Sequence, residues 1–314
     1  MPDPLRQTRL STTVAGLELA SPIVLAAGTA GYADELRDAF DLSEIGAVVT
    51  KSITREPRPG NETWRIVPSK AGMLNAIGLA NPGIERFVDE VAPRLGRVPT
   101  TVIGSIAGNA ADDYAAVAER MDAVEALPAV ELNVSCPNVH GGTEFGVDPE
   151  ALRGLVAAVR GVLARTRLLV KLSPIAVGQP GIVEVAQAAV EAGADGLTIA
   201  NTVPAMAIDV NARRPVLSNV TGGLSGPAVH PIAVRLVHLV HRALPEVPIV
   251  GVGGVSAWDD AAELILAGAS ACQVGTALFA NPRAPIRLNR DLAKWVAAQG
   301  ESCVADLVGR VELG

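Results

Sequence analysis

The segment from residue 131 to residue 142, ELNVSCPNVHGG, contains the residue types best suited to chemistry. It starts within an apolar run, residues 129–134, that predicts a short buried strand, and the Pro, Asn and Gly residues that follow cannot continue a sheet. Cys136 therefore follows a strand end, which is where parallel α/β proteins bind ligands. A thiol there is suited to proton transfer or nucleophilic attack; the alternative is a small apolar residue at a strand end.

Polar side chains also follow several other expected strands. Lys51 and Lys171 end apolar runs, where a charge is costly unless it meets a partner or reaches solvent. Asn75, Asn133 and Asn201 supply neutral amides that can both donate and accept hydrogen bonds. Three amides and two lysines around one opening suit a planar, polar heterocycle that bears a carboxylate.

Glycine-rich turns follow the last two expected strands. Gly253-Gly254 and Gly275-Thr276 can expose backbone N–H groups to a phosphate, as in many α/β barrels, although a glycine pair alone is often only a tight turn. Residues 221–227 can add further donors. A phosphate site, two lysines and one thiol together suggest a flavin mononucleotide (FMN) enzyme, in which the flavin takes a hydride and the thiol takes a proton.

Apolar runs alternate with helical patterns along the chain, which predicts an α/β protein with a single (β/α)8 barrel domain over residues 1–314. Glycines at 46, 193 and 268 are expected to end helices in the left-handed conformation. Long insertions at 54–82 and 201–226 are expected at the C-terminal face of the strands. The expected strands are 23–26, 47–50, 101–104, 130–134, 168–171, 196–199, 248–252 and 271–274, and the main helices are 112–122, 149–163, 181–191, 227–243 and 258–266.

Composition narrows the possible functions. A formal net charge of −7 over 314 residues argues against nucleic acid as a partner. The three cysteines, Cys136, Cys272 and Cys303, are far apart, so we expect no disulfide framework, no metal site and no iron–sulfur cluster held by this chain alone. The N-terminus lacks the apolar core of a signal peptide, which predicts a cytoplasmic protein without a membrane partner.

Taken together, these motifs closely resemble the class 1 dihydroorotate dehydrogenases over about residues 22–282. Class 2 enzymes use a serine base and a membrane segment, whereas this chain has Cys136. Class 1A enzymes also use cysteine, but segments 138–142 and 206–209 look more like the NAD-linked class 1B catalytic subunit. The motifs that carry the resemblance are Lys51-Ser52, residues 75–79, residues 133–142, Asn201-Thr202, residues 221–227, Gly253-Gly254 and Gly275-Thr276.

The resemblance implies oxidation of (S)-dihydroorotate to orotate in pyrimidine (UMP) biosynthesis. Cys136 would remove the C5 proton. The glycine-rich composition of residues 138–146 separately predicts a mobile lid over the substrate, and the alternative is an ordinary solvated loop. Orotate would be held by Lys51, Asn75, Ala76, Ile77, Gly78, Leu79, Asn133, Asn201 and Thr202. FMN would contact Ala27, Lys51, Ser52, Ser105, Asn133, Lys171, Ala200, Gly226, Gly253, Gly254, Gly275 and Thr276. Ser105 and Ala80 depart from the family pattern, in which Asn and Gln are more usual.

The resemblance also implies partners. A class 1B chain forms a homodimer and passes electrons to NAD through a separate subunit that carries FAD and a 2Fe–2S cluster, giving a heterotetramer. This chain has no dinucleotide-binding G-x-G-x-x-G unit of its own. The alternatives are a fumarate-linked class 1A enzyme, a dihydropyrimidine dehydrogenase-type flavin barrel, and a phosphate-binding barrel without a redox role.

Overall fold

Eight parallel strands close into a barrel in the computed structural model, which describes residues 9–135, 145–175 and 177–314. Neighbouring strands follow chain order around the barrel, and the last pairs with the first. All eight lie where the sequence predicts them, with ends shifted by at most two residues. They are β3 (Ile23–Leu25), β4 (Ala47–Val49), β7 (Thr101–Ile106), β8 (Ala129–Asn133), β9 (Arg167–Lys171), β10 (Gly196–Ile199), β15 (Ile249–Val252) and β16 (Ala271–Val274).

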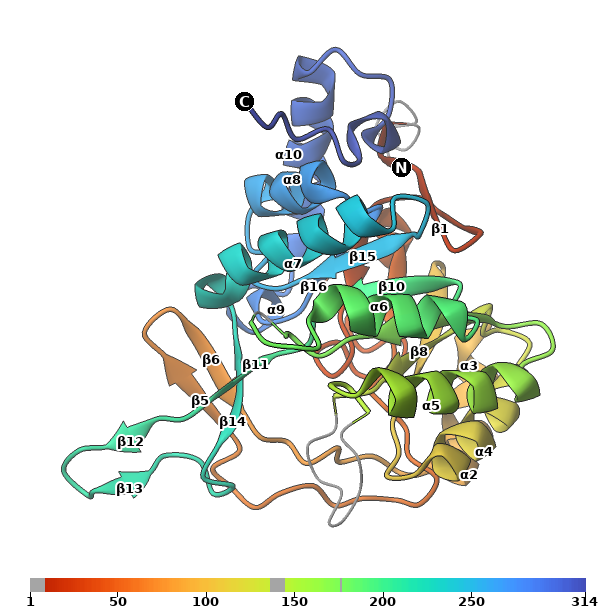
Figure 1. The fold of residues 1–314 in the computed structure, drawn as a ribbon, viewed down its shortest axis with the longest axis vertical. Coiled ribbons are helices and arrows are strands. Elements are labelled where there is room, and N and C mark those ends of the chain that lie inside the picture. Colours follow the sequence, from red (N-terminus) through yellow and green to blue (C-terminus); the bar gives the residue numbers. More distant parts are fainter. Residues whose placement is uncertain (1–8, 136–144, 176) are drawn as a thin grey trace.

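Helices cover the outside of the barrel (Figure 1). In α5, for example, the Asp148 carboxylate accepts hydrogen bonds from the first turn, and Leu152, Leu155 and Val156 are buried along one face. The longer helices are α4 (Ala111–Asp122), α5 (Pro149–Val162), α6 (Ile182–Glu191), α7 (His230–Ala243), α8 (Trp258–Ala267) and α10 (Ala284–Ala298). Short ones are η1 (Leu42–Glu44), α2 (Ile84–Arg86), η2 (Phe87–Val91), α3 (Ala92–Leu95), η3 (Pro227–Val229), α9 (Ala277–Ala280) and η4 (Val304–Leu307).

Two of the three hydrophobic clusters among the described residues form the core of the barrel, and the third packs around Leu74, Ala76 and Leu217 of the insertions. The larger lies between the strands and the helices, and the smaller includes Val24, Val49 and Leu169 from the strands. Val14 and Leu19 join the smaller cluster from an antiparallel hairpin, β1 (Thr12–Val14) and β2 (Leu17–Leu19). In the three described ranges, every helix is too short or too polar to be a bilayer-spanning segment.

The two insertions fold against each other, which the sequence did not predict. β5 (Ile66–Ser69) and β6 (Gly72–Asn75) come from the first, and β11 (Val203–Ala205) and β14 (Gly222–Ser225) from the second. They form one antiparallel sheet in the order β11-β14-β6-β5. A further hairpin of β12 (Ile208–Asp209) and β13 (Arg214–Pro215) projects from the body of the molecule (Figure 1). Because β11 follows β10 directly, the sheet stands at the C-terminal end of the barrel.

The helix-ending glycines behave in two ways. Gly193 and Gly268 have φ angles of +107° and +124°, as predicted. Gly46 does not take a positive φ, so the prediction for that position was wrong. Glycine is needed there for a different reason: a Cβ atom would lie 2.0 Å from the Ser21 carbonyl oxygen. Close backbone approach, rather than left-handed backbone, explains this residue.

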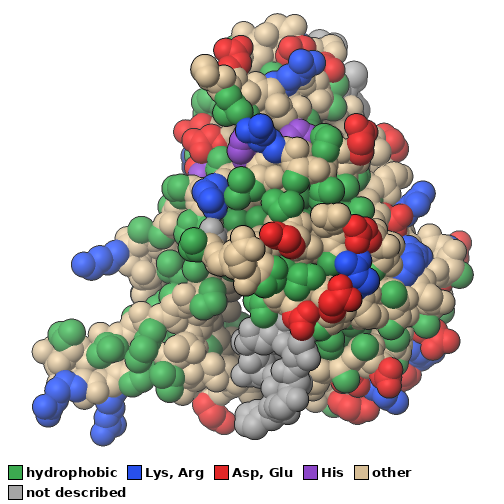
Figure 2. All heavy atoms as spheres, viewed as in Figure 1, with side chains coloured by type: hydrophobic (Ala, Val, Ile, Leu, Met, Phe, Trp, Pro, Cys, Tyr) green, Lys and Arg blue, Asp and Glu red, His purple; other side chains and the backbone are tan. Residues whose placement is uncertain are grey.

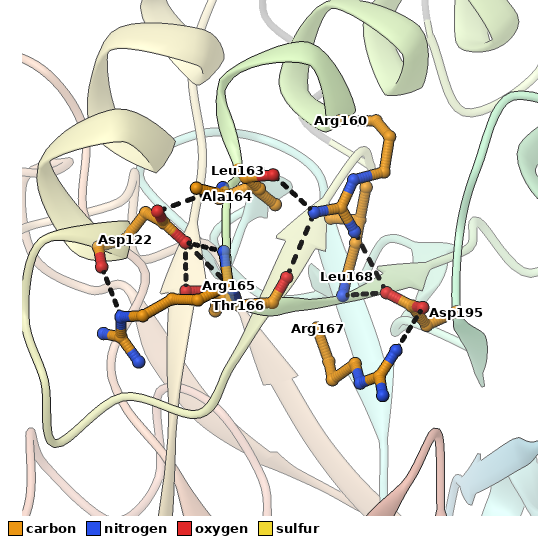
Figure 3. A network of polar contacts seen from close by, with 9 residues as sticks. All are labelled: Asp122, Arg160, Leu163, Ala164, Arg165, Thr166, Arg167, Leu168 and Asp195. Carbon is orange, nitrogen blue, oxygen red and sulfur yellow. Dashed lines mark hydrogen bonds and ion pairs between the residues drawn. The ribbon is translucent and has the colours of Figure 1, made fainter.

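A polar network fixes the start of β9 (Figure 3). The Asp122 carboxylate at the end of α4 accepts hydrogen bonds from the backbone N–H groups of residues 164–166 and from Thr166 Oγ1. Asp195, just before β10, accepts the Leu168 N–H at 2.7 Å. Two arginines also pair with this second carboxylate: Arg160 at 3.1 Å and Arg167 at 3.3 Å. The network joins neighbouring βα units at the end of the barrel opposite the insertions.

Replacing Asp122 by alanine is expected to destabilise the fold by about 1–2 kcal/mol at neutral pH, because several N–H donors lose their acceptor. Burial alone would raise the pKa of this carboxyl, but hydrogen bonds from Thr166 and its neighbours outweigh burial and lower it. Because the pKa of Asp122 is lower in the folded protein, its contribution to stability is complete above about pH 4. This contribution disappears as the pH falls through the pKa of Asp122 in the folded state. Urea unfolding at pH 7 and pH 3 tests this. Asp38→Ala, at a side chain that is 94% exposed, is the control. An equal loss of unfolding free energy in both variants would contradict the prediction.

Candidate active site

A continuous chain of hydrogen bonds links predicted site residues from four strand ends. Ser105 and Ser52 share a hydrogen bond of 2.8 Å between their hydroxyls. Asn133 donates to Ser52 Oγ at 3.4 Å and accepts from Asn201 Nδ2 at 3.0 Å. Asn201 Oδ1 in turn accepts the Thr202 N–H at 2.7 Å. The predicted residues at the C-terminal ends of β4, β7, β8 and β10 therefore lie together at the mouth of the barrel (the opening). Ser105, despite its shorter side chain, keeps a polar partner.

The predicted substrate segment, residues 75–79, joins the same opening through the added sheet. Asn75 pairs with Gly223 in the register of β6 and β14, and its Nδ2 donates to the Gly223 carbonyl at 3.2 Å. A Cβ at Gly223 would lie 1.9 Å from Thr202 Oγ1, so Thr202 packs directly against this strand. Ala76, Ile77, Gly78 and Leu79 follow Asn75, the last two with φ angles of +74° and +55°.

Asn81 holds this segment in shape. It is buried, and its Nδ2 donates to the Leu79 carbonyl at 2.7 Å and to Thr54 Oγ1 at 2.8 Å. Its Oδ1 accepts the N–H groups of Thr54 and Gly83. The sequence reasoning missed Asn81, although an amide directly before Pro82 in a substrate loop was a usable signal.

Lys51 brings positive charge to the opening. Its side chain is half-buried, and its backbone N–H donates to the Gly31 carbonyl at 2.9 Å. Burial lowers the pKa of the Lys51 ammonium, and the nearby positive charge of Arg65 lowers it further. Two cations this close favour an anionic ligand, because an anion would relieve their repulsion.

Lys171 is the second predicted lysine, and it lies opposite Asn133 in the register of β8 and β9. It is only 6% exposed. Its Nζ donates to Gln273 Oε1 at 2.8 Å and lies 3.6 Å from Glu131 Oε1. Lys171 therefore meets buried partners of this chain rather than solvent, and its predicted contact with the flavin stays a prediction.

The predicted phosphate-binding turns also come together. Gly226 and Gly254 have φ angles of +94° and +74°, and a Cβ at Gly254 would lie 2.8 Å from the Gly226 carbonyl oxygen. Thr276 Oγ1 donates to Ser225 Oγ at 2.8 Å, next to Gly226. Among the described residues, the backbone N–H groups of this set find no acceptor: Gly253, Gly254, Gly275 and Thr276. Unpaired N–H groups on glycine-rich turns suit a phosphate.

Two further predicted residues, Ala27 and Ala200, follow the barrel strands β3 and β10. Ala200 is buried, and its N–H donates to the Val252 carbonyl at 3.1 Å. Ala27 follows β3 and packs against the inner cluster. Cys136 and residues 138–144 lie outside the described residues, so the predicted base and most of the predicted substrate cover stay predictions. The described residue before them, Ser135, accepts a hydrogen bond from Ser173 Oγ at 3.0 Å.

Sequence reasoning also overlooked polar residues behind the opening. Tyr114 donates its hydroxyl to the Asn133 carbonyl at 2.8 Å and so fixes the end of β8. Glu131 and Gln273 lie inside the barrel and contact Lys171. A glutamate in the middle of the apolar run 129–134 was the signal that could have revealed this cluster, because an ionised side chain in such a run needs buried partners.

The sequence of this chain matches the family model described as dihydroorotate dehydrogenase over residues 9–296. The chain belongs to the dihydroorotate dehydrogenase family. It is 48% identical to the dihydroorotate dehydrogenase B (NAD(+)) catalytic subunit of Pelobacter propionicus, covering 96% of this chain and 98% of that one. Proteins of the same description from Geobacter sulfurreducens and Listeria monocytogenes are each 46% identical, covering 98% and 95% of this chain and 100% and 97% of theirs. The family that the sequence motifs predicted is thereby confirmed, and the closed barrel of parallel strands confirms the predicted fold.

Proposed function

We propose that this protein oxidises dihydroorotate to orotate with FMN as its cofactor. The observation that carries the proposal is the row of hydrogen bonds that joins the predicted amides and hydroxyls at the C-terminal end of the barrel, where Lys51 and the glycine turns also follow their strands. A sugar-phosphate barrel would use the turns but would leave the amides and lysines without a shared ligand. Near full-length identity to proteins described as dihydroorotate dehydrogenase B supports the same substrate.

The residues present fit FMN. The free N–H groups of the glycine turns would hold its phosphate, and Lys171, Ser52 and Asn133 would lie along its ring system. Bound FMN supplies a two-electron acceptor for the C6 hydride of the substrate. Lys51 and the substrate segment 75–79 would hold the orotate carboxylate and ring, and Asn133 and Asn201 would fix the ring through amide hydrogen bonds. Cys136, three residues after Asn133 in the sequence, would take the C5 proton.

We further propose that the electrons leave through a partner. Relatives are described as an NAD(+)-linked catalytic subunit, which supports a second subunit, and we infer that it carries FAD and a 2Fe–2S cluster. A homodimer of this chain, docked with that subunit as a heterotetramer, is the proposed assembly. The projecting arm formed by β12 and β13 supports oligomerisation, because hydrophobic side chains lie along it with basic ones at its end (Figure 2). Its exposed apolar residues are Met206, Ile208 and Val210.

Anaerobic reduction of the purified chain tests this function. Dihydroorotate should bleach the yellow flavin, whereas dihydrouracil should not. The reduced chain alone should pass electrons to NAD slowly, and addition of the partner subunit should make transfer fast. A colourless protein, or equal reduction by both pyrimidines, would overturn the proposed function. Fast transfer to fumarate would instead identify a class 1A enzyme.

Replacing Lys51 by methionine is expected to weaken orotate binding about 10- to 100-fold, since a hydrogen bond to a charged group contributes about 1.5–3 kcal/mol. Only the protonated ammonium attracts the carboxylate. Because the pKa of Lys51 is lowered, wild-type affinity should start to fall at a lower pH than an ordinary lysine would allow. Orotate titrations of the flavin spectrum at several pH values measure both effects. Lys70→Met, at an exposed side chain in the turn between β5 and β6, is the matched control; similar affinity losses in both variants would refute the role of Lys51.

A further inference from the structure

An ionisable group that the proposed reaction does not use lies inside the barrel. Glu131 on β8 has no exposed surface. Its Oε2 accepts hydrogen bonds from Thr198 Oγ1 at 2.8 Å and from Gln273 Nε2 at 2.6 Å. Its Oε1 accepts no hydrogen bond from a described residue, and the Lys171 ammonium lies 3.6 Å away. Within the described part of the chain, Lys171 is thus the one cation that pairs with Glu131.

The position of this cluster follows from strand order. β8 and β16 stand on opposite sides of the barrel, so the bond between Glu131 and Gln273 must cross its interior. Lys171 reaches the same point from β9, where Gln273 Oε1 accepts its ammonium at 2.8 Å. Thr198 adds the fourth strand, β10. One glutamine amide therefore links both charges, accepting from the lysine and donating to the carboxylate.

Stability alone is a weak reason for such a cluster. Burying two ions costs more desolvation energy than their attraction readily repays, and apolar residues of similar size often stabilise such a position as well or better. The lysine, however, is the register partner of Asn133 at the proposed flavin ring. A carboxylate held next to that lysine partly cancels its positive charge where the flavin would sense it.

We infer that Glu131 is the positioning residue and counter-ion of Lys171, and that Gln273 fixes the pair so that its net charge sets the reduction potential of bound FMN. This inference rests on the proposed function. With both residues present the pair carries no net charge. Removal of the carboxylate leaves a positive charge, which favours the electron-rich reduced flavin. Removal of the lysine leaves a negative charge, which opposes it.

Spectroelectrochemical titration of the FMN-loaded protein tests the inference. Glu131→Gln should raise the midpoint potential, with about a tenfold change in the ratio of reduced to oxidised flavin, which is about 30 mV for a two-electron couple. Lys171→Met should lower it by a similar amount. The double variant, again without net charge in the pair, should return close to the wild-type potential. A purely structural role for Glu131 predicts no such return.

Thr198→Val is the matched control, because it removes one hydrogen bond to Glu131 and leaves both charges in place; its potential should stay at the wild-type value. An unchanged or lowered potential in Glu131→Gln would overturn the inference. Should that variant fail to fold, the double variant decides, since it buries no unpaired charge: a potential as low as that of Lys171→Met alone would overturn the counter-ion role. Wild-type protein that dihydroorotate does not reduce would instead refute the proposed function.

Discussion

Replacing Cys136 by serine is expected to slow reduction of the bound flavin by dihydroorotate about 10²- to 10⁴-fold at pH 7, with the flavin retained. The base must lose its own proton before it can accept the C5 proton, and a hydroxyl is a far weaker acid than a thiol. In the wild type, the rate should rise with pH through one ionisation, since a free thiol has a pKa of about 8.5. Stopped-flow measurement of flavin bleaching between pH 6 and pH 10 gives both quantities.

Cys303→Ser is the matched control for this substitution. Cys303 is partly exposed and donates to Asp306 at the start of η4, near the C-terminus. Its replacement by serine should leave the rate and its pH profile unchanged. Flavin reduction at a near-normal rate in Cys136→Ser at pH 7 would rule out Cys136 as the base.

Replacing Gly254 by alanine is expected to produce protein that has lost most of its flavin, with FMN affinity reduced about 10- to 100-fold. At a φ of +74° a side chain is strained, which costs about 1–2 kcal/mol, and the new Cβ would lie 2.8 Å from the Gly226 carbonyl oxygen. Either the turn or its neighbour must move, and both belong to the proposed phosphate site. The ratio of flavin absorbance to protein absorbance in the purified variant measures the loss.

Gly300→Ala is the control that separates the effect of backbone strain from the effect of location in the proposed phosphate site. Gly300 has a φ of +80°, nearly that of Gly254, but a Cβ there meets no atom within 4 Å, and the residue follows α10. Both variants should lower thermal stability through the same backbone strain, whereas only Gly254→Ala should lose flavin. Full flavin content in Gly254→Ala would mean that this turn does not hold the phosphate.

The barrel could be predicted because its signal is local. Each strand is a short apolar run that is buried on both faces, so β10 and β16 were predicted with their observed ends. The same locality explains the error at Gly46. A glycine between a helix and a strand is the usual sign of left-handed backbone, whereas the close approach of the Ser21 carbonyl depends on packing that the sequence does not display.

The sequence predicted which polar residues stand at the strand ends, but not how they are hydrogen-bonded to one another. The resemblance identified Asn133, Asn201 and Ser52, yet their joint hydrogen bonding depends on how neighbouring strand ends face one another. Glu131 was missed because it was counted within an apolar run, and its partner Gln273 follows 142 residues later. Polar pairs so far apart in the sequence produce no periodic sequence pattern, so they become visible only in the folded structure.

The sheet shared by the two insertions has a consequence for the order in which the protein can fold. β5 and β6 form a local hairpin, but Asn75 meets Gly223 only across 148 residues of chain. Contacts of such high sequence separation require a long loop to close first, and the entropy lost on closure opposes folding until the contacts have formed. During synthesis, the four barrel strands that separate the two insertions (β7, β8, β9 and β10) must emerge before the second insertion exists. Completion of the substrate opening is therefore a late step, and a chain truncated before β14 lacks the strand on which Asn75 rests.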